Sequence, residues 1–122
     1  MRNLTLAGVA IIASSLLIPT AQANEQLFVS ICSYVKANEK NRLRKKLKEG
    51  RVNLRNIYSS LACNGDNLLQ TAYKADANEV GKFIVKRVSS KALKQSKVWE
   101  WANANGKAAS PITAALKGKL KL

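Results

Sequence analysis

The chain has 122 residues, and its 21 lysine and arginine residues outnumber its 7 aspartate and glutamate residues, which gives a formal net charge of +14. A basic balance of this size favours anionic partners, such as nucleic acid, lipid headgroups, lipopolysaccharide phosphates or an acidic protein, although it also serves simply to keep a small domain solvated. The absence of histidine excludes the commonest general base, the usual triads and the commonest metal ligand, which leaves 7 carboxylates and 2 cysteines as candidate catalytic groups.

Residues 1–23 are typical of a secretory signal peptide. A positive charge at Arg2 precedes an almost wholly apolar run over residues 4–18, and Ala21-Gln22-Ala23 is the small-x-small pattern after which signal peptidase cuts. Cleavage there leaves a single mature domain, residues 24–122, which we expect in the periplasm of a Gram-negative cell. The apolar run is short and broken for a membrane span, and an uncleaved anchor is the alternative interpretation.

Cys32 and Cys63 are the only cysteines of the chain. In an oxidising compartment an even number of cysteines favours a structural disulfide, and two cysteines allow one intramolecular pairing. A redox role would require a Cys-x-x-Cys motif or an activated thiol, and a metal site would require more ligands than two thiols. We therefore expect a disulfide between Cys32 and Cys63 and no metal site.

The first part of the mature chain, residues 24–50, predicts a pair of helices. Apolar residues recur at i, i+3, i+4 and i+7 over residues 25–36, which is typical of a helix with one buried face. Asn38 is a candidate cap for a second helix that continues to Glu49, and Gly50 follows where a helix C-terminal glycine belongs.

Residues 51–63 form the next segment and fit neither the helical nor the strand period well. We expect a packed connector here, with a turn of helix at residues 54–58. Asn64-Gly65, a strong turn dipeptide, marks the end of this connector.

The following segment, residues 64–88, predicts a second pair of helices. Asp66 or Asn67 is placed to cap the first of them, and residues 78–88 have the apolar spacing of the other. Gly81 lies inside this second helix, where glycine costs about 1 kcal/mol relative to alanine, so we expect it to permit close packing.

The C-terminal part, residues 89–122, predicts two further helices. Ser89 or Ser90 is a candidate cap for a stretch that continues to Asn105. Ser110-Pro111 then supplies an N-cap followed by proline at the first helical position, which is typical of the start of a last helix. No segment alternates like a strand, so the whole mature chain is predicted to be all-α.

The second helix pair resembles an ankyrin repeat, whose pattern is Gly-x-Thr-Pro-Leu-His-x-Ala followed at a fixed offset by Glu-Val-Val. The matching positions are Gly65, Leu69, Ala72, Glu79 and Val80. Residues 35–50 fit the template more weakly, whereas Asn67 and Leu68 replace Thr-Pro and Gln70 replaces His. The resemblance implies a short ankyrin-like stack of helix-turn-helix pairs, extended by the C-terminal helices and pinned by one disulfide.

The order of motifs is also similar to that of a small bacterial family catalogued only as a domain of unknown function. The shared features are a first-helix cysteine, an Arg-Leu-Arg-Lys-x-Leu-Lys run, a Leu-Arg-x-Ile-Tyr motif and Cys-Asn-Gly with two leucines, found here at Cys32, residues 42–48, residues 54–58 and residues 63–69. This resemblance implies an exported protein with no assigned activity, and it supports the disulfide and the helical fold.

The densest run of positive charge is the candidate anion-binding site of the chain. Its residues are Arg42, Arg44, Lys45, Lys46, Lys48, Arg51 and Arg55. Leu43 and Leu47 turn one side of this helix inward, so the cations are expected on the exposed side, where arginine offers bidentate contacts to phosphate. The alternative is a solvated helix face without a ligand, which is the commoner role of a charge run.

Three aromatic residues and the last helix offer further alternatives. Trp99, Trp101 and Tyr73 suit either stacking on bases, a lipid interface or a place in the core. The helix predicted over residues 111–122 is basic and amphipathic, so it suits either membrane-surface contact or the capping of the stack.

The sequence contains no catalytic or nucleotide-binding constellation, because its acidic residues are scattered and it has no phosphate loop. We therefore predict a protein that is not an enzyme and has no cofactor, metal or small-molecule substrate. The expected function is that of a basic interaction module in the periplasm, whose partner is an acidic protein or an anionic envelope component. The alternative is direct binding of an anionic polymer or a membrane surface through the lysine- and arginine-rich face.

Overall fold

A computed structural model describes residues 20–122, which form α-helices and no β-strand, so the all-α prediction is confirmed. The predicted signal peptide lies outside this part of the chain, except that the first helix begins at Thr20 and not near Glu25. The helices are α2 (Thr20–Lys36), α3 (Lys40–Glu49), α4 (Leu54–Ile57), α5 (Leu68–Lys74), α6 (Asn78–Arg87), α7 (Ser90–Gln95), α8 (Val98–Ala104) and α9 (Pro111–Leu120). None of these helices is long and apolar enough to cross a membrane.

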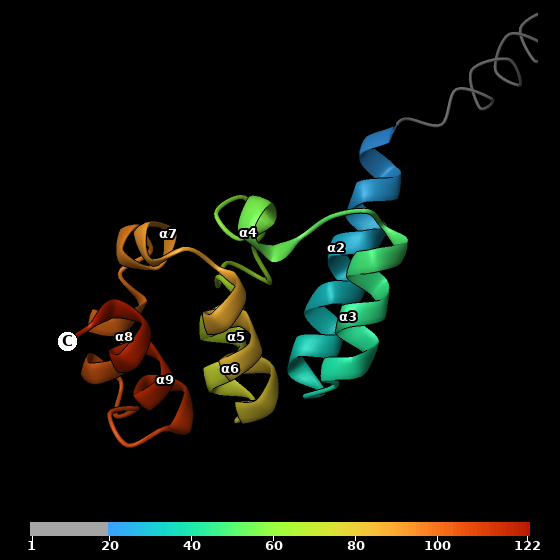
Figure 1. Cartoon of the computed structure of the whole chain (residues 1–122). Coiled ribbons are helices and arrows are strands. Elements are labelled where there is room, and N and C mark those ends of the chain that lie inside the picture. The colour runs from blue at the N-terminus through green and yellow to red at the C-terminus, as the bar shows by residue number, and fades with distance from the viewer. Residues whose placement is uncertain (1–19) are drawn as a thin grey trace, which may run out of the picture.

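The helices stack as consecutive antiparallel pairs (Figure 1). The pairs are α2 with α3, α5 with α6 and α8 with α9, while the short helices α4 and α7 lie along the upper edge of the stack in this view (Figure 1). The first helices of the pairs contact one another in the order α2, α5, α8, and the second helices in the order α3, α6, α9. Each pair thereby covers an apolar face of its neighbour, while the specific likeness to ankyrin repeats stays a prediction.

Local signals in the sequence account for four of the eight helix starts within residues 20–122, those of α4, α5, α7 and α9. Asn67 caps α5 in a complete capping box, in which its side chain accepts from the Gln70 N–H at 2.8 Å and the Gln70 side chain accepts from the Asn67 N–H at 2.9 Å. Ser89 caps α7 and Ser110 caps α9, with Pro111 at the first position of α9. The helical turn expected at residues 54–58 is α4, which Asn53 caps.

The single helix expected from Ser89 or Ser90 to Asn105 is wrong, because the structure divides it into α7 and α8. Leu93 and Val98 are both fully buried, and five residues of continuous helix would turn their side chains about 140° apart. A left-handed Lys97, with φ of 59°, breaks the helix between them so that both reach the core. The Ser96 hydroxyl at this break donates to the Leu93 carbonyl and accepts from the Tyr58 hydroxyl at 3.1 Å.

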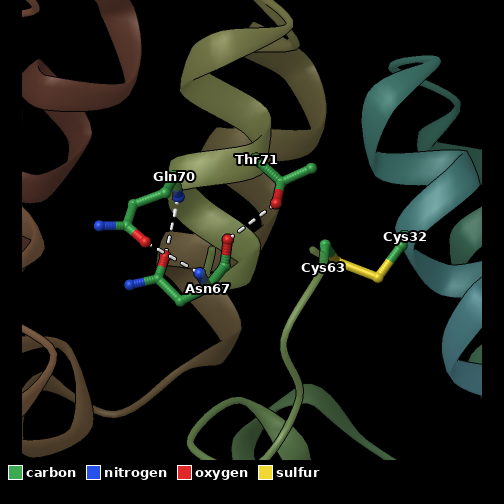
Figure 2. Close-up of a disulfide and its surroundings, with 5 residues drawn as sticks. All are labelled: Cys32, Cys63, Asn67, Gln70 and Thr71. Carbon is green, nitrogen blue, oxygen red and sulfur yellow. Dashed lines mark hydrogen bonds between the residues drawn. A yellow bond between two sulfur atoms is a disulfide. The ribbon is translucent and has the colours of Figure 1, made fainter. Parts of the chain in front are cut away.

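The predicted disulfide between Cys32 and Cys63 is present and joins α2 to the segment that leads into α5 (Figure 2). Its cysteines are 31 positions apart in the sequence, and the entropy of closing a loop of this size corresponds to a stabilisation of about 3–4 kcal/mol. Cys63 is buried in the core, beside the capped start of α5 (Figure 2). The bridge therefore anchors the first helix pair to the second.

Gly81 allows α6 and α9 to pack closely. A Cβ atom at this position would overlap Cδ1 and lie 2.5 Å from Cγ1 of Ile112, which is fully buried in α9. Contacts this short would force the isoleucine side chain or the helices apart. The expectation that Gly81 permits close packing is therefore confirmed.

We predict that Gly81→Ala lowers the free energy of unfolding by about 1–2 kcal/mol, because the clash with Ile112 outweighs the better helix propensity of alanine. Gly118→Ala is the matched control, since Gly118 also lies inside a helix but a Cβ there has no atom within 4 Å. That variant should gain about 0.5–1 kcal/mol. Urea unfolding of both variants measures the difference, and equal stability of the two would show that the close contact is unimportant.

Candidate functional site

An open groove of about 690 Å³ lies where α3, α4 and α6 meet. Its charged lining consists of Arg44, Lys45, Lys48, Arg55 and Arg87, and we call it the basic groove. All of these side chains are exposed, and no aspartate or glutamate is among the lining residues. The groove therefore concentrates positive charge around a concave surface.

The packing of α3 directs three of its cations, Arg44, Lys45 and Lys48, toward the groove. Leu43 and Leu47 are one turn apart and buried against the core, so the residues between them point outward. Arg55 reaches the groove from α4, where the buried residues Leu54 and Ile57 fix the helical turn on either side of it. The prediction that this run turns its cations toward solvent is confirmed for these residues.

Two groove residues, Phe83 and Arg87, were missed by sequence reasoning. Both lie in α6, and the Arg87 guanidinium carbon stands 5.0 Å from the centre of the Phe83 ring, which is a cation–π contact. Their spacing of four residues predicts that they share a helix face. The sequence does not indicate which neighbouring helix this face contacts. Only the packing of α6 against α3 places the face in the groove.

Three of the predicted anion-binding residues do not line the groove: Arg42, Lys46 and Arg51. Arg42 lies 3.7 Å from the carboxylate of Glu39, and Lys46 lies 3.7 Å from that of Glu49, both within α3 or at its start. Arg51 is exposed in a left-handed turn after α3, with φ of 55°. Four of the seven cations that the sequence predicted as one patch therefore line the groove, and the other three lie outside it.

The aromatic residues considered for stacking are largely part of the core. Tyr73 is buried, its ring centre is 5.6 Å from that of Trp101, and its hydroxyl lies 2.7 Å from the hydroxyl of Thr113. Trp99 and Trp101 are partly buried against the core. The apolar stripe of α9 is likewise used internally, because Ile112, Leu116 and Leu120 are buried in the stack.

The buried tyrosines are poor acid–base groups at neutral pH. Burial raises the pKa of Tyr58 to about 12, against the opposing effect of its hydrogen bond to Ser96, and burial also raises the pKa of Tyr73. Both hydroxyls therefore stay protonated and serve as structural hydrogen-bonding groups. Within residues 20–122, no three cysteine, aspartate or glutamate side chains gather as a potential metal site.

Asn38 holds the two main walls of the groove in register. The prediction that it caps α3 is wrong, because Glu39 occupies that position and Asn38 adopts a left-handed conformation with φ of 56°. Its side-chain oxygen instead accepts from the backbone N–H of Val80, at 3.0 Å, in the first turn of α6. The turn between α2 and α3 thus caps a helix of the next pair.

We predict that Asn38→Gly lowers the free energy of unfolding by about 1 kcal/mol, because it keeps the left-handed turn but removes the acceptor for the Val80 N–H. Asn38→Asp retains an acceptor in the same place, and its charge suits the N-terminus of α6. We therefore expect chemical denaturation to give the aspartate variant a free energy of unfolding close to that of the unaltered protein. An aspartate variant as unstable as the glycine variant would contradict the role of this contact.

Comparison with known proteins identifies a family but no described activity. No curated protein and no solved structure matches the chain. Residues 31–95, more than half of the chain, match the family described as "Protein of unknown function (DUF3718)". This segment contains both cysteines of the disulfide and every residue that lines the basic groove. The chain therefore belongs to the DUF3718 family of proteins of unknown function.

Proposed function

We propose that the protein is exported and acts as a non-enzymatic binding module, whose basic groove holds an anionic partner in the periplasm. Export is supported by the signal-like residues 1–23 and by a disulfide, which suits an oxidising compartment. A binding role is supported by the surface cations, which converge on a groove without any catalytic group among its lining residues.

The observation that carries the proposal is the convergence of five cations on one groove whose lining includes no carboxylate. Arg44, Arg55 and Arg87 provide planar guanidinium groups that match carboxylate or phosphate in two parallel hydrogen bonds. Lys45 and Lys48 add mobile point charges beside them. A concave surface of one sign raises the local concentration of anions and speeds their association.

The floor of the groove adds an apolar component to the recognition. Leu47, Val52, Leu54 and Phe83 line it together with the cations, and Val52 and Phe83 are only partly buried. An anionic partner with some apolar surface would gain contact area there as well as charge pairing. This combination distinguishes the basic groove from a charged helix face that is merely solvated.

We predict that the protein purified from whole cells of its natural host begins at Asn24 and contains no free thiol. Cleavage after Ala23 removes the signal-like segment, and oxidation pairs Cys32 with Cys63. Intact-mass spectrometry with and without reduction and alkylation measures both features at once. A chain that keeps Met1 and reacts with the alkylating reagent before reduction would contradict export.

We predict that Lys45→Gln combined with Lys48→Gln weakens the binding of tripolyphosphate, a compact polyanion, by about tenfold at low salt, because each lost contact is worth about 0.7 kcal/mol. The matched control is Lys91→Gln combined with Lys94→Gln. These lysines are also exposed, three residues apart and near the end of a helix, but lie outside the groove. Titration calorimetry measures both variants and the unaltered protein.

The control pair removes the same charge, so it should change the affinity by less than twofold if the groove is the site. Moderate salt should weaken binding to the unaltered protein steeply, because exposed charges are screened. Failure of tripolyphosphate to bind, or equal losses in the groove pair and the control pair, would contradict the proposed function.

A further inference from the structure

A second basic hollow lies on the other side of Phe83. It has a volume of about 560 Å³ between α6 and α9, with the start of α3 at its edge. Its cations are Lys40, Lys82, Lys86 and Lys119, and we call it the lysine groove. Glu79 is the only acidic residue of its lining, and its carboxylate is 3.7 Å from the Lys82 ammonium group.

Phe83 lines both hollows and is the ridge between them. The neighbouring residues Lys86 and Arg87 diverge from α6 on either side of this ridge, one into each groove. Lys40 and Arg44 do the same from α3. The two grooves therefore form one basic track across the layer of second helices.

We propose that this track binds a linear polymer of phosphate groups, which lies in the basic groove, crosses Phe83 and continues into the lysine groove. The inference rests on the proposed function and extends it, because it names the chemistry of the ligand and a second part of its site. Phosphate groups at intervals along a flexible chain would pair with the cations on both sides of the ridge.

Charge density favours phosphate over carboxylate. Five cations line one groove and four line the other, and Glu79 is the one carboxylate in the lining of the two grooves. Each phosphate inside a polyphosphate chain has one charge and two non-bridging oxygens, as a carboxylate has, but it repeats every two backbone atoms, whereas the carboxylates of an acidic peptide are at least three backbone atoms apart.

The form of the surface favours a chain over a membrane. The cations line two hollows, which a thin polymer can enter but a flat bilayer cannot follow. Peripheral membrane binding also uses exposed apolar residues as anchors. The large hydrophobic residues that are exposed in the described structure are Val29 and Leu122, and neither lines either groove.

The lysine groove is partly preorganised for this role. The Lys119 ammonium group donates to the Lys86 carbonyl at 3.0 Å, which ties α9 to the C-terminal end of α6. An ammonium group has three protons, so this bond leaves donors for a ligand. Arg87 is held against Phe83 on the other side, which limits the freedom that this side chain loses on binding.

The test compares chain lengths. Lys82→Gln combined with Lys86→Gln removes two cations of the lysine groove, whereas Lys45→Gln combined with Lys48→Gln removes two of the basic groove. We expect the lysine-groove pair to weaken binding of long-chain inorganic polyphosphate about tenfold and to change tripolyphosphate binding by less than twofold. The basic-groove pair should weaken both, and thermal unfolding of each variant confirms that it is folded.

Unchanged affinity of the lysine-groove pair for long-chain polyphosphate would overturn the continuous track and leave the basic groove intact as a site. Loss of tripolyphosphate binding in that pair would also overturn it, because the short probe would then depend on both grooves. Failure of the unaltered protein to bind tripolyphosphate would instead overturn the proposed function itself. The two proposals therefore fail by different results.

Three competitors define the ligand class. Single-stranded DNA that displaces polyphosphate would support a phosphate chain of nucleic-acid origin, and its failure to do so would support a chain without bases. Polyglutamate that binds as tightly as polyphosphate of equal charge would overturn the preference for phosphate. Anionic phospholipid vesicles that bind more tightly than polyphosphate would overturn the choice of a chain over a membrane.

Discussion

The position of α6 between α3 and α9 is the constraint on which the rest of the structure depends. On one side Gly81 lets α9 approach until Ile112 fills the space of a missing Cβ, and on the other the Asn38 side chain accepts from the Val80 N–H. These contacts fix the separation and register of three helices at once. Because α6 forms a wall of both grooves, with α3 and α4 in the basic groove and with α9 and the start of α3 in the lysine groove, the spacing of the cations follows from the packing of α6.

The electrostatic balance of the molecule leaves its grooves available to a ligand. The ion pairs Arg42–Glu39, Lys46–Glu49 and Lys82–Glu79 each join neighbours in the chain at 3.7 Å, and they are exposed. Such pairs contribute little to stability. The excess of positive charge is therefore mostly unneutralised, and its mutual repulsion opposes folding of a small domain. The disulfide and the buried apolar faces of the helix pairs offset that repulsion.

Local chemistry made much of the fold predictable. Helix starts that depend on a side chain within three residues, as at Asn67, Ser89 and Ser110, were predicted to within one residue, because the capping oxygen and the N–H from which it accepts are close in the chain. The cysteine pairing followed from having two thiols and from the expectation that the chain is exported. The errors arose where a distant segment competes with local preference: Asn38 caps α6 instead of α3, and the core requires a break at Lys97.

Part of the candidate site was predictable because it depends on helix periodicity, which is local in the chain, and the rest depends on contacts between distant segments. The spacing of Leu43 and Leu47 shows which cations of α3 face solvent, so Arg44, Lys45 and Lys48 could be identified from the sequence. Arg42 and Lys46 share the same run but turn away from the groove, which the charge run alone does not reveal. Phe83 and Arg87 come from a helix that lies more than thirty residues later in the chain.

The amino-acid sequence by itself determined the helical elements, the charge and the sole possible disulfide, because each depends on residue types and on spacing within a few turns of chain. Only the tertiary structure decided which cations converge, that Phe83 divides them into two grooves, and that Asn38 serves the next helix pair. These features depend on how one helix face meets another. The angle and register of that contact are set by the summed packing of residues far apart in the chain.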